Sequence, residues 1–96
     1  MLCYLLVQDS GLWAKIGESK NPANRIKSLN KGRPEKFSGK FIVTCSGKSI
    51  DVEHYIKTQY LKTSLIEGTE FFNKTIMKDL VSKLKRDRLL KVRTYY

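Results

Sequence analysis

Residues 2–7 constrain the fold most, because this run is apolar without alternating between apolar and polar positions. Such a pattern is typical of a strand that is buried on both faces of a sheet. Turn-forming residues at 8–11 follow, and a second apolar stretch covers 12–16. The sequence therefore predicts that the chain begins with a β-hairpin.

Three helices are expected after the hairpin, and each follows a residue that can accept hydrogen bonds from the first helical turn. The capping residues and helices are Asn21 before 22–30, Ser49 before about 50–61, and Asn73 before a helix that ends near 88. Pro22 strengthens the first of these predictions, because proline is favoured at the first helical position.

Further strands are expected between the helices. Apolar residues at alternate positions predict a half-buried strand within 37–45, and 69–72 forms a short extended segment. The tail, 89–96, fits either an added strand or a basic extended arm. The order predicts one α/β or α+β sandwich over 1–88, with a small mixed or antiparallel sheet flanked by about three helices.

The charge of the chain favours a polyanionic partner. The 96 residues carry a net charge of +10 and have a pI of about 9.8. Segments 15–40 and 74–96 each contribute +6, and they bracket a nearly neutral middle. Clustered lysines and arginines of this kind are typical of a surface that binds phosphates.

Cysteine, histidine and hydropathy exclude other classes of protein. Two cysteines without CxxC spacing and one histidine cannot form an ordinary four-ligand zinc site. We expect Cys3 and Cys45 to be small buried hydrophobes and place the chain in the cytoplasm. No apolar run approaches the ~20 residues of a membrane helix, and residues 1–7 are too short for a signal peptide.

Four residues have the chemistry that phosphodiester hydrolysis requires: Tyr4, Lys15, Arg25 and Glu53. Glu53 can ligate Mg²⁺, a hard cation that accepts one or two carboxylates and keeps its waters. Arg25 offers a planar fork for two phosphate oxygens, and Tyr4 can relay a proton from a bound water. Lys15 suits either a base with a lowered pKa or a cation that holds a phosphate.

The spacing of these residues resembles the GIY-YIG nuclease superfamily. Residues 2–4, Leu-Cys-Tyr, stand where Gly-Ile-Tyr would, and residues 15–17, Lys-Ile-Gly, stand where Tyr-Ile-Gly would. The match continues through Ser19, Asn21-Pro22, Arg25, Leu29-Asn30, Glu53 and Glu70-Phe71-Phe72. This pattern is similar to the branch with lysine in its second motif, which includes small phage domains and the meiotically up-regulated class.

The resemblance implies a Mg²⁺- or Mn²⁺-dependent DNA endonuclease, acting as a monomer or homodimer, in the host cytoplasm if the protein is phage-encoded. Its catalytic residues would be Tyr4, Lys15, Arg25 and Glu53, with Glu53 as the metal ligand. Residues expected to bind nucleic acid are Gly17, Ser19, Lys20, Lys27, Lys31, Arg33, Asn73, Lys74 and Lys78.

Two alternatives remain open at this stage. One is a catalytically inactive module that binds nucleic acid or has a regulatory role. Two departures from the superfamily favour it: lysine replaces the second tyrosine, and the usual histidine is missing after Arg25. The other is a small basic phage protein that binds an acidic host protein. Phosphate binding should weaken steeply with salt, which distinguishes these two.

Overall fold

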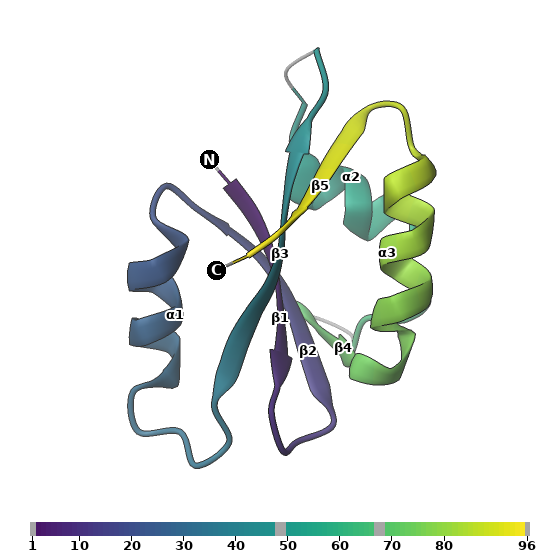
Figure 1. The fold of residues 1–96 in the computed structure, drawn as a ribbon. Helices are drawn as coiled ribbons and strands as arrows, with labels where there is room; N and C mark the ends of the chain where they lie inside the picture. The colour runs from purple at the N-terminus through teal and green to yellow at the C-terminus, as the bar shows by residue number, and fades with distance from the viewer. Residues whose placement is uncertain (1, 48–49, 67–68, 96) are drawn as a thin grey trace.

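The computed structural model describes residues 2–47, 50–66 and 69–95, which form one antiparallel sheet with helices on both faces (Figure 1). Its strand order is β4-β2-β1-β3-β5. The strands are β1 (Leu2–Gln8), β2 (Trp13–Ser19), β3 (Phe37–Cys45), β4 (Phe71–Asn73) and β5 (Leu90–Thr94). The helices are α1 (Pro22–Asn30), α2 (Val52–Gln59) and α3 (Met77–Arg86), with a 3₁₀ turn at Lys74–Ile76. The α+β prediction is confirmed, and the sheet is antiparallel.

Strand β1 lies at the centre of the sheet and pairs with both β2 and β3. Its side chains alternate between the two faces, since Cys3 and Leu5 belong to one hydrophobic cluster and Tyr4 and Leu6 to the other. All four are at most 2% exposed. The prediction of a strand buried on both faces is therefore confirmed.

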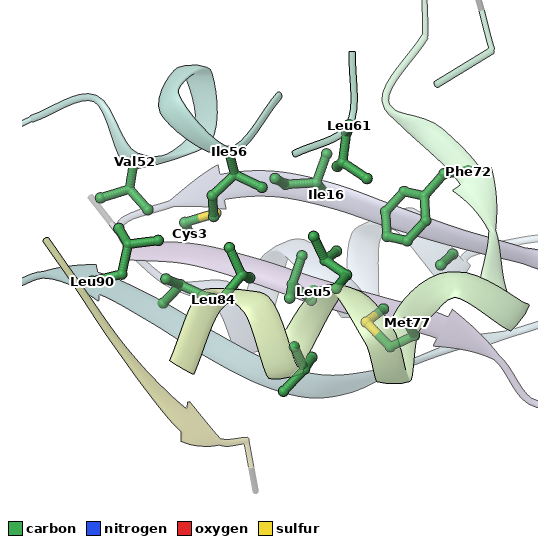
Figure 2. Packing of buried hydrophobic residues seen from close by; sticks show 14 residues of the cluster. Cys3, Leu5, Ile16, Val52, Ile56, Leu61, Phe72, Met77, Leu84 and Leu90 are labelled. Carbon is green, nitrogen blue, oxygen red and sulfur yellow. The ribbon is translucent and has the colours of Figure 1, made fainter. Parts of the chain in front are cut away.

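The larger core fills the space between the sheet and helices α2 and α3 (Figure 2). Helix α3 contributes a buried stripe of Met77, Leu80, Val81 and Leu84, which repeats every three to four residues as an amphipathic helix requires. A smaller core separates the sheet from α1, where Ile26 packs against the second cluster. The sheet is therefore covered on one face by α2 and α3 over the larger core and on the other face by α1 over the smaller core.

Local capping explains where the helices begin. Asn21 Oδ1 accepts the backbone N–H of Asn24 at 3.2 Å, so α1 has the predicted bounds. Helix α2 is shorter than predicted, because Asp51 is its N-cap. Ser49, the expected cap, lies outside the described residues. Asn73 caps the 3₁₀ turn that precedes α3, rather than α3 itself.

Strand β3 departs from the predicted single half-buried face. Leu5 pairs with Phe41 but Leu6 pairs with Gly39, so Lys40 is an extra residue, a β-bulge. Side chains along a strand alternate between the two faces of the sheet, so the extra residue changes which face the odd-numbered residues occupy. Phe37 therefore packs on the α1 side, whereas Val43 packs on the α2 and α3 side.

The remaining sequence expectations concern the tail and the cysteines. The tail forms β5, which pairs antiparallel with β3, so the strand alternative holds for Leu90–Thr94. Both cysteines are free thiols, and Cys3 is buried while Cys45 is half-buried. Burial and nearby carboxylates raise the pKa of the Cys3 thiol well above its ordinary range. Across the described ranges, no helix has the length and apolar character needed to cross a bilayer.

Candidate active site

The β1–β2 register places Tyr4 directly opposite Gly17. The Tyr4 ring lies across this glycine so closely that a Cβ at position 17 would be 2.6 Å from the ring carbon Cζ. Real Cβ contacts are essentially never this short, so Gly17 is required by the ring beside it. The two motif residues thus form one packed unit on the α1 face of the hairpin.

Arg25 is an exposed residue of α1, and its guanidinium acts on the Tyr4 hydroxyl. Burial raises the pKa of Tyr4, and the hydrogen bond and charge of the Arg25 guanidinium act in the opposite direction without outweighing it. The carboxylates of Glu70 and Glu53 raise this pKa further. Tyr4 is therefore a protonated phenol at neutral pH, and the charges of Arg25, Glu70 and Glu53 all act on its pKa.

Lys15 is buried on the same face, with 5% of its surface exposed. Its Nζ contacts Glu70 Oε2 and lies 5.2 Å from the centroid of the Phe71 ring. A carboxylate partner and an aromatic face are both contacts of an ammonium ion. Of the two roles open to Lys15, these contacts favour a fixed positive charge.

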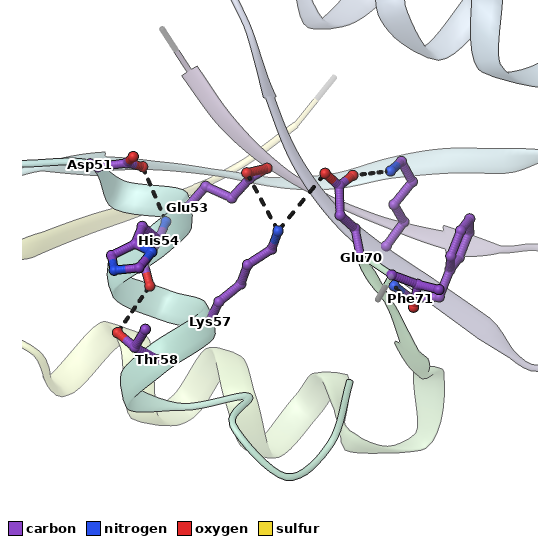
Figure 3. Close-up of polar contacts among 9 residues, drawn as sticks. Asp51, Glu53, His54, Lys57, Thr58, Glu70 and Phe71 are labelled. Carbon is purple, nitrogen blue, oxygen red and sulfur yellow. Dashed lines mark hydrogen bonds and ion pairs between the residues drawn. The ribbon is translucent and has the colours of Figure 1, made fainter. Parts of the chain in front are cut away.

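Glu53 points from α2 toward Glu70, and Lys57 lies between the two carboxylates (Figure 3). Lys57 Nζ is 3.7 Å from Glu53 Oε2 and 3.8 Å from Glu70 Oε1. Burial raises the pKa of Glu53, as do Glu70 and two further acids, while Lys57 lowers it without outweighing them. Burial also acts to raise the pKa of Glu70, but Lys15, followed by Lys57 and Arg25, holds it below its ordinary value.

These residues meet at the edge of β2. Strand β4 pairs with β2 only from Trp13 to Lys15, and Glu70 immediately precedes β4. Lys15 reaches Glu70 from the α1 face and Lys57 reaches it from α2, so Glu70 joins the two faces. We call this group the β2-edge cluster, and its members are Tyr4, Lys15, Arg25, Glu53, Lys57 and Glu70.

The structure places the four predicted catalytic residues in this cluster, with Gly17 inside it. Lys57 and Glu70 complete it, although the sequence predicted a catalytic role for neither. The Glu53–Lys57 spacing of four helical residues is a signal that could have identified Lys57. Nothing local in the sequence links Lys57 to Glu70, because their contact depends on the packing of α2 beside β4.

Residues predicted to bind nucleic acid from the second half of the chain lie elsewhere. Asn73 pairs with Trp13, four residues along β2 from Gly17, a distance of roughly 13 Å. Its Oδ1 accepts the N–H of Thr75 at 3.0 Å, and Lys74 Nζ donates to the carbonyl of Gln8 at 2.9 Å. Lys78 is exposed on α3.

The expected binding residues near α1 are divided between exposed and structural positions. Lys20, Lys27 and Lys31 are exposed. Ser19 Oγ accepts the N–H of Asn21 at 3.1 Å, and Arg33 Nε donates to the carbonyl of Leu29 at 3.0 Å. Helices α1 and α3 cover opposite faces of the sheet, so the lysines of α3 do not share a surface with those of α1 (Figure 1). Arg93 of β5, by contrast, lines a cleft together with Pro22 of α1.

The cluster also bears on the expected metal. Among residues 2–47, 50–66 and 69–95, no three His, Cys, Asp or Glu side chains are grouped so that they could hold a metal ion. However, Glu53 and Glu70 direct oxygens toward one shared cation, the Lys57 ammonium. Two carboxylates with water in the remaining positions form a donor set that suits Mg²⁺. The donor types would therefore suit Mg²⁺, with Glu53 as the predicted ligand and Glu70 as a second carboxylate, although the Lys57 ammonium lies between them.

A scan against protein-family models and searches of curated proteins and solved structures found no match for this chain.

Proposed function

We propose that this chain is a GIY-YIG-like protein that hydrolyses phosphodiester bonds in DNA and depends on Mg²⁺ or Mn²⁺. One observation carries the proposal. Tyr4, Lys15, Arg25 and Glu53 come from four different elements, yet they gather with Glu70 at one edge of the sheet. This is the combination of fixed cations, carboxylates and a proton donor that phosphoryl chemistry needs.

The two cations bind the substrate in this proposal. Arg25 is exposed and can present its fork to two oxygens of the scissile phosphate. Lys15 is buried and held by Glu70, so its side chain is already ordered before the substrate binds. Its positive charge acts on the same phosphate. Fixed charges of this kind stabilise the additional negative charge of the transition state.

Glu53 and Glu70 hold the metal ion in this proposal. When bound, the ion supplies a water of lowered pKa and further charge stabilisation. Lys57 must turn away from the two carboxylates for them to serve as ligands. Tyr4, whose raised pKa keeps it protonated, holds a proton at Oη and orients the attacking oxygen beside Arg25.

Cleavage assays test the proposal directly. Supercoiled plasmid and single-stranded DNA are incubated with the protein in Mg²⁺, in Mn²⁺ and in EDTA, and the products are separated on gels. We expect metal-dependent cleavage that falls at least 100-fold in Glu53→Gln and in Arg25→Ala, on the scale of one lost transition-state contact. Lys62→Gln, an exposed lysine after α2, is the matched control. Cleavage that persists in both site variants would contradict the assignment.

A module that binds nucleic acid without cutting it is the second candidate. The net charge of +10 favours it, as do the ion pairs that hold Lys57 between Glu53 and Glu70. Strong binding that weakens steeply with salt, with no product in either metal, would support this candidate over the nuclease. In either case we place the protein in the cytoplasm, since neither role needs an oxidising compartment.

A further inference from the structure

A second basic surface lies away from the β2-edge cluster, between α1 and the outer half of the sheet. It is an open groove of about 830 Å³. Its lining includes the apolar residues Ala23 and Ile26 and three lysines, and Tyr95 closes one side. We call it the α1–β3 groove.

Tyr95 is seated in this groove by the sheet. Its backbone N–H donates to the carbonyl of Lys40 at 3.0 Å, which fixes the residue just beyond β5. Its ring lies against Gly39, where a Cβ would be 2.6 Å from the ring carbon Cε1. The ring is half-exposed and also lines an adjoining cleft beside Pro22 and Arg93. The fold thus presents one aromatic side chain to two neighbouring hollows.

The charge of the groove has one sign. Lys27 and Lys31 are exposed and lie one helical turn apart, about 6 Å along the axis of α1. Lys36 Nζ donates to the carbonyl of Asn30 at 2.9 Å and adds a third positive charge. No carboxylate lines the groove, and within the described part of the chain neither Lys27 nor Lys31 has one within 4 Å.

We infer that the α1–β3 groove binds an unpaired stretch of a nucleic-acid strand, with a base stacked on Tyr95 and phosphates on Lys27 and Lys31. A ring beside positive charges is the usual platform for single strands. A duplex would not suit the groove, because its base faces are already stacked. The inference rests on the proposed function only in taking nucleic acid as the substrate.

Binding is measured by fluorescence anisotropy in EDTA, so that cleavage does not enter the result. The probes are a labelled thymidine oligonucleotide of about 12 nucleotides, within the range of single-strand sites, and an abasic strand of equal length. A duplex and an acidic peptide of equal charge are the competitors. We expect the base-bearing strand to bind at least about fivefold more tightly than the abasic strand, the lower end of stacking strengths.

Two variants assign this preference to the groove. Tyr95→Leu keeps an apolar side chain on Gly39 and should remove the preference for bases, while Tyr95→Phe should retain it. Lys27→Gln combined with Lys31→Gln should weaken binding of both strands and reduce the salt slope by about 1.4. Lys62→Gln, away from the groove lining, should change neither measurement.

Equal affinity of the unaltered protein for base-bearing and abasic strands would overturn the inference, even if Tyr95→Leu does not fold. An unchanged base preference in folded Tyr95→Leu would also overturn it, as would an acidic peptide that competes as well as the oligonucleotide. If the groove assignment fails in these binding assays, plasmid cleavage by Tyr95→Leu at the normal rate would leave the proposed nuclease intact. Conversely, base-dependent binding without any cleavage would support the groove alone.

Discussion

The ring of Tyr4 occupies the space that a side chain at position 17 would need, with Cζ 2.6 Å from the place of a Cβ. Because Tyr4 is 2% exposed, its ring cannot simply turn into solvent. The glycine at position 17 is therefore required by its packing against the Tyr4 ring.

Gly17→Ala should consequently destabilise the protein by about 1–3 kcal/mol, the usual cost of overpacking a core. Urea unfolding measures the change. In a Tyr4→Leu background the same substitution should cost less, because the ring that it meets is gone. Equal costs in both backgrounds would show that the ring does not set the requirement for glycine.

Lys15 and Glu70 should respond unequally to removal of their partner. The Lys15 side chain is 7% exposed, whereas that of Glu70 is 39% exposed and also lies near Lys57. Glu70→Gln leaves a buried ammonium without a carboxylate and should cost about 2–3 kcal/mol. Lys15→Met leaves a carboxylate that water can solvate and should cost less. Thermal unfolding of both single variants and the double variant tests this, and a larger cost for Lys15→Met would contradict it.

Lys57 competes with the proposed metal for the same two carboxylates. Lys57→Met should therefore tighten Mg²⁺ binding by up to about thirtyfold, since each of the two partly exposed ion pairs is worth up to about 1 kcal/mol. It should also raise the pKa of Glu53, because the positive charge of Lys57, which lowers this pKa, is lost. Calorimetric titration with MgCl₂ measures the affinity, with Lys62→Met as the control. Weaker Mg²⁺ binding in Lys57→Met would argue against the shared site.

Asp87 joins the end of α2 to the turn between α3 and β5. Its Oδ2 accepts the hydroxyls of Tyr60 at 2.5 Å and Tyr55 at 2.7 Å, and its Oδ1 accepts the N–H of Leu89 at 2.9 Å. The two tyrosine hydrogen bonds hold the pKa of Asp87 below its ordinary value of 3.8. The unfolded chain therefore binds this proton more tightly than the folded chain does.

The stabilisation from Asp87 should be complete above about pH 4 and should decline as the pH falls from the ordinary pKa through the folded pKa. Asp87→Asn should lower the melting temperature at pH 7 by on the order of 5 °C, the scale of one hydrogen bond to a charged group. The difference from the unaltered protein should shrink toward pH 3. Asp79→Asn, on an exposed ion pair with Lys83, is the control. A difference that does not change with pH would contradict the linkage.

The sequence predicted those parts of the fold that are decided by neighbouring residues. Helix α1 has its predicted bounds because Asn21 and Pro22 act within one turn. Helix α2 begins later than predicted, because Asp51 caps it and local pattern alone did not rank Asp51 above Ser49. The bulge at Lys40 could not be predicted, since it exists only in the pairing of β3 with β1.

The candidate site divides in the same way. Tyr4, Lys15 and Gly17 share a hairpin, so their spacing predicts their proximity. The contact of Lys57 with Glu70 depends on how α2 packs beside the start of β4, and no short pattern encodes it. Lys15, taken alone, reads as a surface lysine at the end of a strand. Its burial follows from Glu70 and Phe71, more than fifty residues later.

Because of the bulge at Lys40, the odd-numbered residues of β3 face one layer of helices before the bulge and the other layer after it. Before the bulge, odd-numbered residues such as Phe37 pack on the α1 side of the sheet. After it, Ile42 packs on that side and Val43 packs on the side of α2 and α3. A saturation-mutagenesis profile along β3 should therefore change phase at Lys40. Because Lys40 has no partner on β1, its deletion would leave every pairing on both sides of the bulge in place, so loss of one codon should be less damaging here than at a paired position such as Ile42.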